Sequence, residues 1–267
     1  MSKGIRYFIE SLKTQFKDAP FSGDFATWGE ACAASSGYSS EIILEKVRNS
    51  FLKVKNGEAA FERDSMVYPE IEYSWPLLAA IMLVASCNGN RLNLIDFGGS
   101  MGSTYYQNRK FLSYLDQLNW NVVEQEHFVE CGRQLNEDHN LKFYPNVEEC
   151  CADNDPKAIL FSSVIQYMES PYDLIEETIA REFDFILFDR TPFLTEGKDR
   201  LTIQKVPPEI YEATIPCWFL NVNTFTGKFG QHYDLVADFD GLERAAVKHS
   251  VFKGFIFKKR GKHAETL

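Results

Sequence analysis

The pattern of apolar and polar positions changes near residue 90. Before that point apolar residues recur at the spacing of helices. A helix is predicted over 4–17, a second begins near Ser39 or Ser40, and a third covers 75–85 with Pro76 in its first turn. We therefore expect the first ninety residues to be mainly helical. They either cap the sheet predicted below or simply pack against it.

From residue 92 short apolar runs alternate with amphipathic segments. This alternation predicts a parallel sheet with helices on both faces. Runs such as AILFS and FDFILFD are continuously apolar, which is typical of strands buried on both sides. Two later strands, at 233–239 and 251–258, are expected to pair antiparallel at one edge. The other predicted strands are 92–97, 120–124, 141–144, 158–162 and 183–189, and the predicted helices are 101–118, 128–138 and 172–181.

A glycine-rich turn follows the first of these strands. Residues 92–106 read LNLIDFGGSMGSTYY, so Asp96 precedes Gly98, Gly99 and Gly102. Glycine allows a tight turn and a close approach to a ligand, and the next helix offers unpaired N–H groups at its start. The spacing is close to that of a dinucleotide-binding fingerprint. A turn with a purely structural role is the alternative.

A second acidic position supports a ligand site. Residues 121–124 read as a strand that ends in Glu124. This position follows the glycines by about 20–30 residues, where a nucleoside-binding fold places the acid that accepts from ribose hydroxyls. Neighbouring parallel strands would bring Glu124 and the turn to the same edge of the sheet. The alternative is a surface carboxylate at the end of a strand.

Composition narrows the classes of partner. The 267 residues carry a net charge of −10, which argues against nucleic-acid binding over the whole chain. The longest apolar run, 77–86, is too short for membrane insertion, and no signal peptide is expected. The six cysteines include no C-x-x-C pair, so we expect no metal site and reduced thiols in the cytoplasm.

Together these features resemble class I S-adenosylmethionine-dependent methyltransferases over residues 90–260. In that family the first strand ends in an acid followed by a glycine-rich turn, which is matched here by residues 96–102. The second strand ends in an acid that binds the ribose, which is matched by Glu124. The family's sheet has seven strands with the last one antiparallel, in agreement with the terminal pair. The glycine spacing departs from the commonest family form, which leaves the register of the expected cofactor contacts open by one residue.

A narrower resemblance concerns four segments. They are similar to a bacterial methyltransferase family associated with surface-polysaccharide gene clusters, and read LIDFGGSMGS, ILFSSVIQYMESP, ILFDRTPF and LTIQKVPPEIYEATIPCWF. The resemblance implies an α/β, Rossmann-like seven-stranded sheet with an antiparallel last strand and a helical N-terminal extension. The expected domains are a helical cap at 1–90, a methyltransferase domain at 91–260 and a tail at 261–267. It also implies S-adenosylmethionine as cofactor and a small-molecule substrate, with oxygen of a sugar or sugar nucleotide as the acceptor.

The resemblance assigns roles to the cofactor-side residues. Asp96 and the glycine turn would hold the methionine part, because a carboxylate forms a charge-assisted hydrogen bond with its ammonium group. Glu124 would accept from the ribose, and Gln125 would lie near the adenine. Ser162 would face the cofactor or cap the following helix. The expected cofactor-binding residues are Asp96, Gly98, Gly99, Gly102, Glu124, Gln125 and Ser162.

The fifth strand ends in Asp189 and Arg190. Asp189 is the first candidate for a general base and His232 the second. Arg190 is expected to hold an anionic group of the substrate, or to pair with Asp189. The segment QKVPPEIY, with its path restricted by two prolines, is expected to cover the pocket. Trp28, Tyr68 and Tyr73 would form an aromatic wall or pack in the core. Other expected substrate contacts are Gln166, Gln204 and Tyr211.

Two other functions stay open at this point. The first is a protein that binds the nucleoside cofactor without catalysis, as a scaffold or sensor. Such a protein would need Asp96 and Glu124 but not Asp189. The second is a nicotinamide-dependent oxidoreductase, which the glycine spacing and the antiparallel terminal pair disfavour.

Overall fold

The computed structural model describes most of the chain, but not the extreme N-terminus. The helix predicted over 4–17 and the predicted substrate contact Tyr211 lie outside the described residues. Within the described part, no helix is long and apolar enough to cross a membrane. All six cysteines are free thiols. The described residues are 20–36, 40–207, 210, 212–241, 243 and 247–261.

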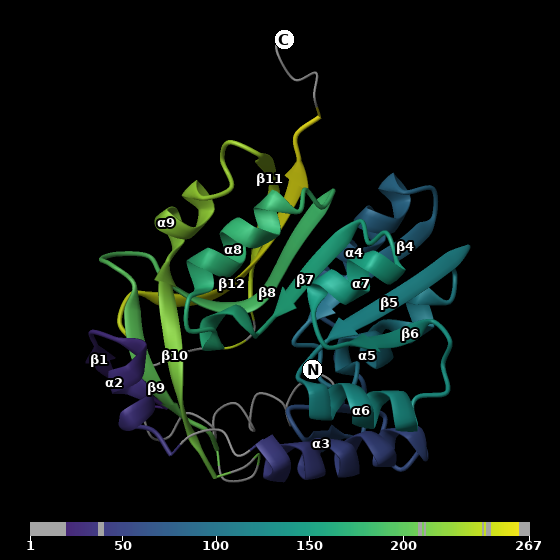
Figure 1. Cartoon of the computed structure of the whole chain (residues 1–267), viewed down its shortest axis with the longest axis horizontal. Coiled ribbons are helices and arrows are strands. Elements are labelled where there is room, and N and C mark those ends of the chain that lie inside the picture. Colours follow the sequence, from purple (N-terminus) through teal and green to yellow (C-terminus); the bar gives the residue numbers. More distant parts are fainter. Residues whose placement is uncertain are drawn as a thin grey trace.

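A twisted sheet forms the centre of the molecule (Figure 1). Its seven central strands are β4 (Arg91–Phe97), β5 (Gln117–Val123), β6 (Leu141–Tyr144), β7 (Ala158–Ser162), β8 (Phe185–Leu194), β11 (Tyr233–Asp240) and β12 (Ser250–Lys259). Their spatial order is β6-β5-β4-β7-β8-β12-β11, and β12 is antiparallel to both of its neighbours. The predicted Rossmann-like sheet with an antiparallel last strand is therefore confirmed.

Helices cover both faces of this sheet, because its strands carry apolar side chains on both sides. In β4, for example, Leu94 and Ile95 are consecutive and fully buried, one in each of the two main core clusters. The first face packs on α4 (Trp75–Cys87), α5 (Ser103–Leu112) and α6 (Glu126–Leu135). The second packs on α7 (Val147–Asp153), α8 (Pro171–Ala180) and α9 (Val222–Gly227).

The register brings the predicted site segments to one edge of the sheet. Phe97, the last residue of β4, lies beside Val123 of β5 and Phe161 of β7. Ser162 at the end of β7 lies beside Asp189 of β8. The glycine turn and the ends of three neighbouring strands therefore meet at the carboxyl edge, where open α/β sheets bind ligands.

Three further strands, which the sequence pattern does not predict, extend the sheet beyond β8. They are β1 (Phe21–Phe25), β9 (Arg200–Lys205) and β10 (Thr214–Asn221), which pair antiparallel in the order β1-β9-β10. The last residues of β10 pair in parallel with the last residues of β8. Pro216 lies inside β10, and proline weakens a strand assignment because it cannot donate to a ladder. The segment QKVPPEIY, which is expected to cover the pocket, therefore begins with the last two residues of β9.

The N-terminal region is also less helical than predicted. It contains α2 (Trp28–Ala33) and α3 (Ser40–Lys55), but also β1 and a hairpin of β2 (Phe61–Arg63) and β3 (Met66–Tyr68). Strands of three residues are too short to show a clear alternation of apolar and polar positions. The hairpin contacts α3 and α5, and thus lies beside the start of the glycine-turn helix.

Most of the predicted elements are present with shifted ends. The largest shift concerns the helix predicted over 101–118, which runs only from Ser103 to Leu112. Gly102 before it is left-handed, with φ of +87°, and so cannot be part of the helix. After Leu112 the chain turns, the Asp116 amide donates to the Asn90 carbonyl, and β5 begins at Gln117.

Candidate active site

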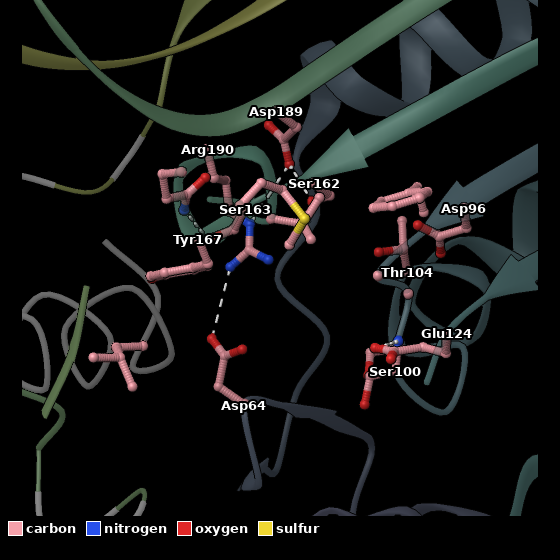
Figure 2. Close-up of a pocket in the computed structure, with 18 of the residues that line it drawn as sticks. Asp64, Asp96, Ser100, Thr104, Glu124, Ser162, Ser163, Tyr167, Asp189 and Arg190 are labelled. Atoms are coloured by element: carbon pink, nitrogen blue, oxygen red, sulfur yellow. Dashed lines mark hydrogen bonds and ion pairs between the residues drawn. The ribbon is translucent and has the colours of Figure 1, made fainter. Parts of the chain in front are cut away.

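A cavity of ≈ 1090 Å³ opens at the carboxyl edge of the sheet. The ends of β4, β5, β7 and β8 form its floor, and α2, the β2–β3 hairpin and β9 contribute its other walls. Ligand pockets for drug-sized molecules usually enclose about 300–1,000 Å³. The cavity therefore has room for a nucleoside-sized molecule and a second small molecule. Figure 2 shows acidic residues at two separate places along it.

The glycine turn between β4 and α5 depends on its glycines. Gly98 has φ of +69°, and a Cβ atom there would lie 2.4 Å from Cγ2 of Val164. A Cβ atom on Gly99 would lie 2.6 Å from Oδ2 of Asp96. The Gly98 amide donates to the Val123 carbonyl, which ties the turn to β5. Larger residues would push the turn away from Asp96 or into the cavity.

Asp96 is a buried carboxylate with one unpaired oxygen. Its residue is 1% exposed, and Oδ2 accepts a hydrogen bond of 3.0 Å from the indole of Trp120. Oδ1 has no partner among the described residues. Burial raises the pKa of Asp96 from 3.8 to about 7, against the lowering effect of the Trp120 bond. A cationic group at Oδ1 would stabilise the ionised carboxylate.

Glu124 follows β5 and lies on the other side of the turn. It accepts from the Ser100 amide at 3.3 Å and from the Gln125 amide at 2.8 Å. Burial raises its pKa above the ordinary value. Two backbone bonds leave further lone pairs free on the carboxylate, since it has about four acceptor sites. Gln125 is exposed, lines the cavity and precedes α6.

The ends of β7 and β8 are tied to each other. The Ser162 hydroxyl donates to Oδ2 of Asp189 at 3.2 Å, and the Ser163 amide donates to the Asp189 carbonyl at 2.9 Å. Gln166, in the short helix η1 (Ile165–Tyr167), donates to the Ser163 hydroxyl at 3.0 Å. The other amide atom of Gln166, Oε1, is buried without a partner in the described structure.

Asp189 and Arg190 form the second charged part of the cavity. Asp189 is 3% exposed, and burial raises its pKa in spite of the nearby Arg190. Arg190 lies near three carboxylates: its Nε is 3.7 Å from Asp189, and one guanidinium nitrogen is 3.7 Å from Glu243 and 3.8 Å from Asp64. Figure 2 shows its side chain extending from Asp189 toward Asp64. Arg190 therefore pairs with Asp189, which is one of the two roles that the sequence allows for it.

The hairpin residues Arg63 and Asp64 are part of the site, although the sequence analysis did not select them. Both line the cavity, from an element far from β8 in the chain. Asp64 and Ser65 form the two-residue turn and have φ of +52° and +67°. Positive φ at both positions is typical of the hairpin turn of type I′. An Asp-Ser turn lacks the glycine that usually signals this turn, so the hairpin had only a weak signal.

His232 is placed away from the site. It is exposed and immediately precedes β11, in which Tyr233 lies opposite Lys259 of β12. Lys258 in turn lies opposite Phe185, the first residue of β8. His232 is therefore at the amino edge of the sheet, whereas the cavity is at the carboxyl edge. This position rules it out as the base of a reaction in the cavity.

Most of the remaining predicted residues line the cavity, but Tyr73 does not. Gln204 lines the cavity, and its Oε1 accepts from the Tyr167 hydroxyl at 2.7 Å. Trp28 and Tyr68 also line the cavity. Tyr73 instead packs its ring 5.1 Å from the rings of Trp75 and Phe111, outside the cavity.

Comparison with known proteins leaves the family unassigned at the level of sequence. No family model matches the chain, and no curated protein matches it significantly. Among solved structures, the chain is similar to the N-terminal domain of EvdMO1, crystallised with S-adenosylhomocysteine (SAH) and D-fucose. The identity is 13% and the TM-score 0.48, over 84% of this chain and 98% of that one.

Two further solved structures are of methyltransferases. The Burkholderia thailandensis 1,6-didemethyltoxoflavin-N1-methyltransferase is 11% identical, with a TM-score of 0.41 over 92% of this chain and 98% of that one. The glycopeptide N-methyltransferase MtfA, complexed with S-adenosylmethionine, is 9% identical, with a TM-score of 0.46 over 67% of this chain and 92% of that one. Likenesses at this level assign neither a ligand nor an activity to this chain.

Proposed function

We propose that this protein transfers a methyl group from S-adenosylmethionine to an oxygen of a small molecule, a sugar or a sugar nucleotide. The observation that carries the proposal is a cavity with two acidic ends on a sheet of this strand order. At one end Asp96 and Glu124 flank the glycine turn, and at the other Asp189 is buried beside Ser162. The choice of a sugar rests on the sequence resemblance described above.

The first end of the cavity fits the cofactor. The unpaired Oδ1 of Asp96 suits the ammonium group of the methionine part, and the free lone pairs of Glu124 suit the two ribose hydroxyls. Gly99 allows the backbone of the turn to lie close beside Asp96, where a Cβ atom would collide with the carboxylate. Gln125 and Ser162 also line the cavity, and Gln125 is proposed to lie near the adenine of the bound cofactor.

The second end fits the acceptor. When bound, S-adenosylmethionine supplies a methyl group that is already activated by its sulfonium. The residues of the chain therefore have to align the acceptor, exclude water and take up its proton. Asp189 is the proposed base, because its burial makes it a stronger base than a surface aspartate. Gln166, through its unpaired Oε1, and Gln204 are proposed to contact the acceptor.

Calorimetric titration with SAH tests the proposal, with NAD as the control ligand. We expect saturable binding of SAH and none of NAD. Methyl transfer from labelled S-adenosylmethionine to sugars and sugar nucleotides would then identify the acceptor. Binding of NAD alone would favour an oxidoreductase. Binding of SAH without transfer to any acceptor would favour a scaffold or sensor.

A further inference from the structure

Arg63 is held at the acceptor end of the cavity by the β2–β3 hairpin. Side chains alternate along β2, so that Phe61 and Arg63 line the cavity while Glu62 between them hydrogen-bonds to Ser103 at the start of α5. The Arg63 guanidinium lies over the Phe61 ring, 5.3 Å from its centroid. Tyr68, opposite Phe61 in the hairpin, lines the same wall. The guanidinium is thus supported on one side and faces the cavity on the other.

The two arginines of the site differ in their partners. Arg190 has three carboxylates within 3.8 Å. Arg63 forms no ion pair or hydrogen bond through its side chain with any residue that the structure describes. Burial and the charge of Arg190 both lower the pKa of Arg63, while Glu243 and Asp64 attract it only from a distance. Arg63 is half-buried, and a partly desolvated guanidinium without an ion-pair partner among the described residues gains from an anion placed against it.

The surrounding carboxylates do not neutralise Arg63 in the way they neutralise Arg190. Asp189 and Glu243 are both in contact with Arg190. The side chain of Asp64 is 62% exposed, and solvent therefore screens its charge. No described residue accepts from the fork of N–H donors on Arg63, which suits a planar or tetrahedral oxyanion.

The hairpin is fixed before any ligand binds. The Ser50 hydroxyl of α3 donates to the Ser65 carbonyl in the turn, and Glu62 is tied to α5. Both anchors hold the strand that carries Arg63. A guanidinium that is already placed loses little conformational entropy when it binds a ligand.

We propose that Arg63 binds an anionic group, a carboxylate or a phosphate, of the methyl acceptor. The identification of the anion as part of the methyl acceptor rests on the proposed function. The existence of an anion site at Arg63 does not. It also changes the expectation from the sequence, which gave this role to Arg190. Arg190 instead forms ion pairs with Asp189, with Glu243 and with Asp64 at the hairpin tip. The acceptor would then be a sugar acid or a phosphorylated sugar rather than a neutral sugar.

The test is calorimetric titration with small anions, performed with and without saturating SAH. Inorganic pyrophosphate represents the phosphate class, D-glucuronate the carboxylate class, and D-glucose is the uncharged counterpart of the latter. We expect one of the two anions to bind and glucose not to bind. Arg63→Gln should weaken that anion at least about tenfold, whereas Arg63→Lys should weaken it less, because lysine keeps the charge but loses the bidentate fork.

Arg91→Gln is the matched control, since Arg91 is exposed at the amino end of β4, on the opposite edge of the sheet. It should leave anion binding unchanged. Unchanged SAH affinity in Arg63→Gln would show that the variant is folded. The inference is overturned if neither anion binds the wild-type protein, or if Arg63→Gln and Arg91→Gln weaken binding equally. Failure of SAH to bind would overturn the proposed function alone. If Arg63→Gln still abolished anion binding in that case, the inference of an anion site at Arg63 would be retained.

Discussion

At the scale of single residues, Asp96 is the group whose charge matters most. In the free protein its pKa is about 7 because it is buried. It is therefore protonated below that pH and ionised above it. A bound ammonium group favours the ionised form, so binding lowers the pKa. Affinity for SAH is then expected to rise with pH up to about 7 and to level off above it.

This pH dependence provides the first prediction. Between pH 5.5 and 7.5, SAH should bind wild-type protein more tightly as the pH rises. Asp96→Asn should bind about tenfold more weakly at pH 7.5, because a charge-assisted hydrogen bond is worth about 1.5–3 kcal/mol, and should show little pH dependence. Calorimetry at several pH values measures both effects. Asp116→Asn, at an exposed position before β5, is the control, and equal behaviour of the two variants would contradict the assigned role.

The second prediction concerns the stability of the ligand-free protein. The unfolded chain ionises Asp96 near 3.8, but the folded protein only near 7. Folding stability is therefore lost as the pH rises between these values and stays low above them. Asp96→Asn removes this loss and should be more stable than wild type at pH 8, by about 1–4 kcal/mol, with little difference at pH 4. Denaturant unfolding at both pH values measures it, and a variant less stable than wild type at pH 8 would argue against it.

The third prediction concerns Asp189 as the base. Asp189→Asn keeps the size of the side chain and can still accept from Ser162. We expect SAH affinity to stay within about twofold of wild type and methyl transfer to fall by about 10²–10⁴. Because burial raises the pKa of Asp189, the wild-type rate should increase with pH as the carboxylate ionises. A normal transfer rate in Asp189→Asn would remove it as the base.

At the scale of elements, the turn between β4 and α5 depends on backbone shape more than on side-chain chemistry. Its glycines occupy positions where φ is positive or where Cβ would collide with a neighbour. The hairpin tip at Asp64 and Ser65 has positive φ without glycine, and contacts with α3 and β8 hold it there. Two turns that carry site residues are thus stabilised in different ways.

The fourth prediction compares two glycines with nearly the same φ. Gly98 has φ of +69° and a Cβ there would collide with Val164, whereas Gly89 has φ of +66° and nothing within 4 Å. Gly89→Ala should cost about 1–2 kcal/mol of unfolding free energy, which is the cost of the left-handed conformation alone. Gly98→Ala should cost more and should also abolish SAH binding. Thermal unfolding and calorimetry compare the two variants, and equal effects would mean that the contact with Val164 is unimportant.

At the scale of the whole molecule, the cavity lies between the carboxyl edge of the sheet and the elements added around it. The β1-β9-β10 extension (Figure 1) and the β2–β3 hairpin come from parts of the chain that are distant in sequence. The hairpin brings Arg63 and Asp64 close to Asp189, Arg190 and Glu243. A site with this composition has no local sequence motif.

The sequence by itself determined the strands of the central sheet and its antiparallel terminal pair, and it predicted that the glycine turn and Glu124 meet at one edge. Apolar runs such as that around Ile95, and the spacing from Asp96 to Glu124, are local patterns with a direct physical meaning. Only the tertiary structure decided the acceptor end. It placed His232 at the opposite edge, surrounded Arg190 with carboxylates, and gave Arg63 a ring contact with Phe61 but no ion pair with any described residue. The reason is that short strands and charge pairs distant in sequence are stabilised by packing, which no periodic pattern in the chain records.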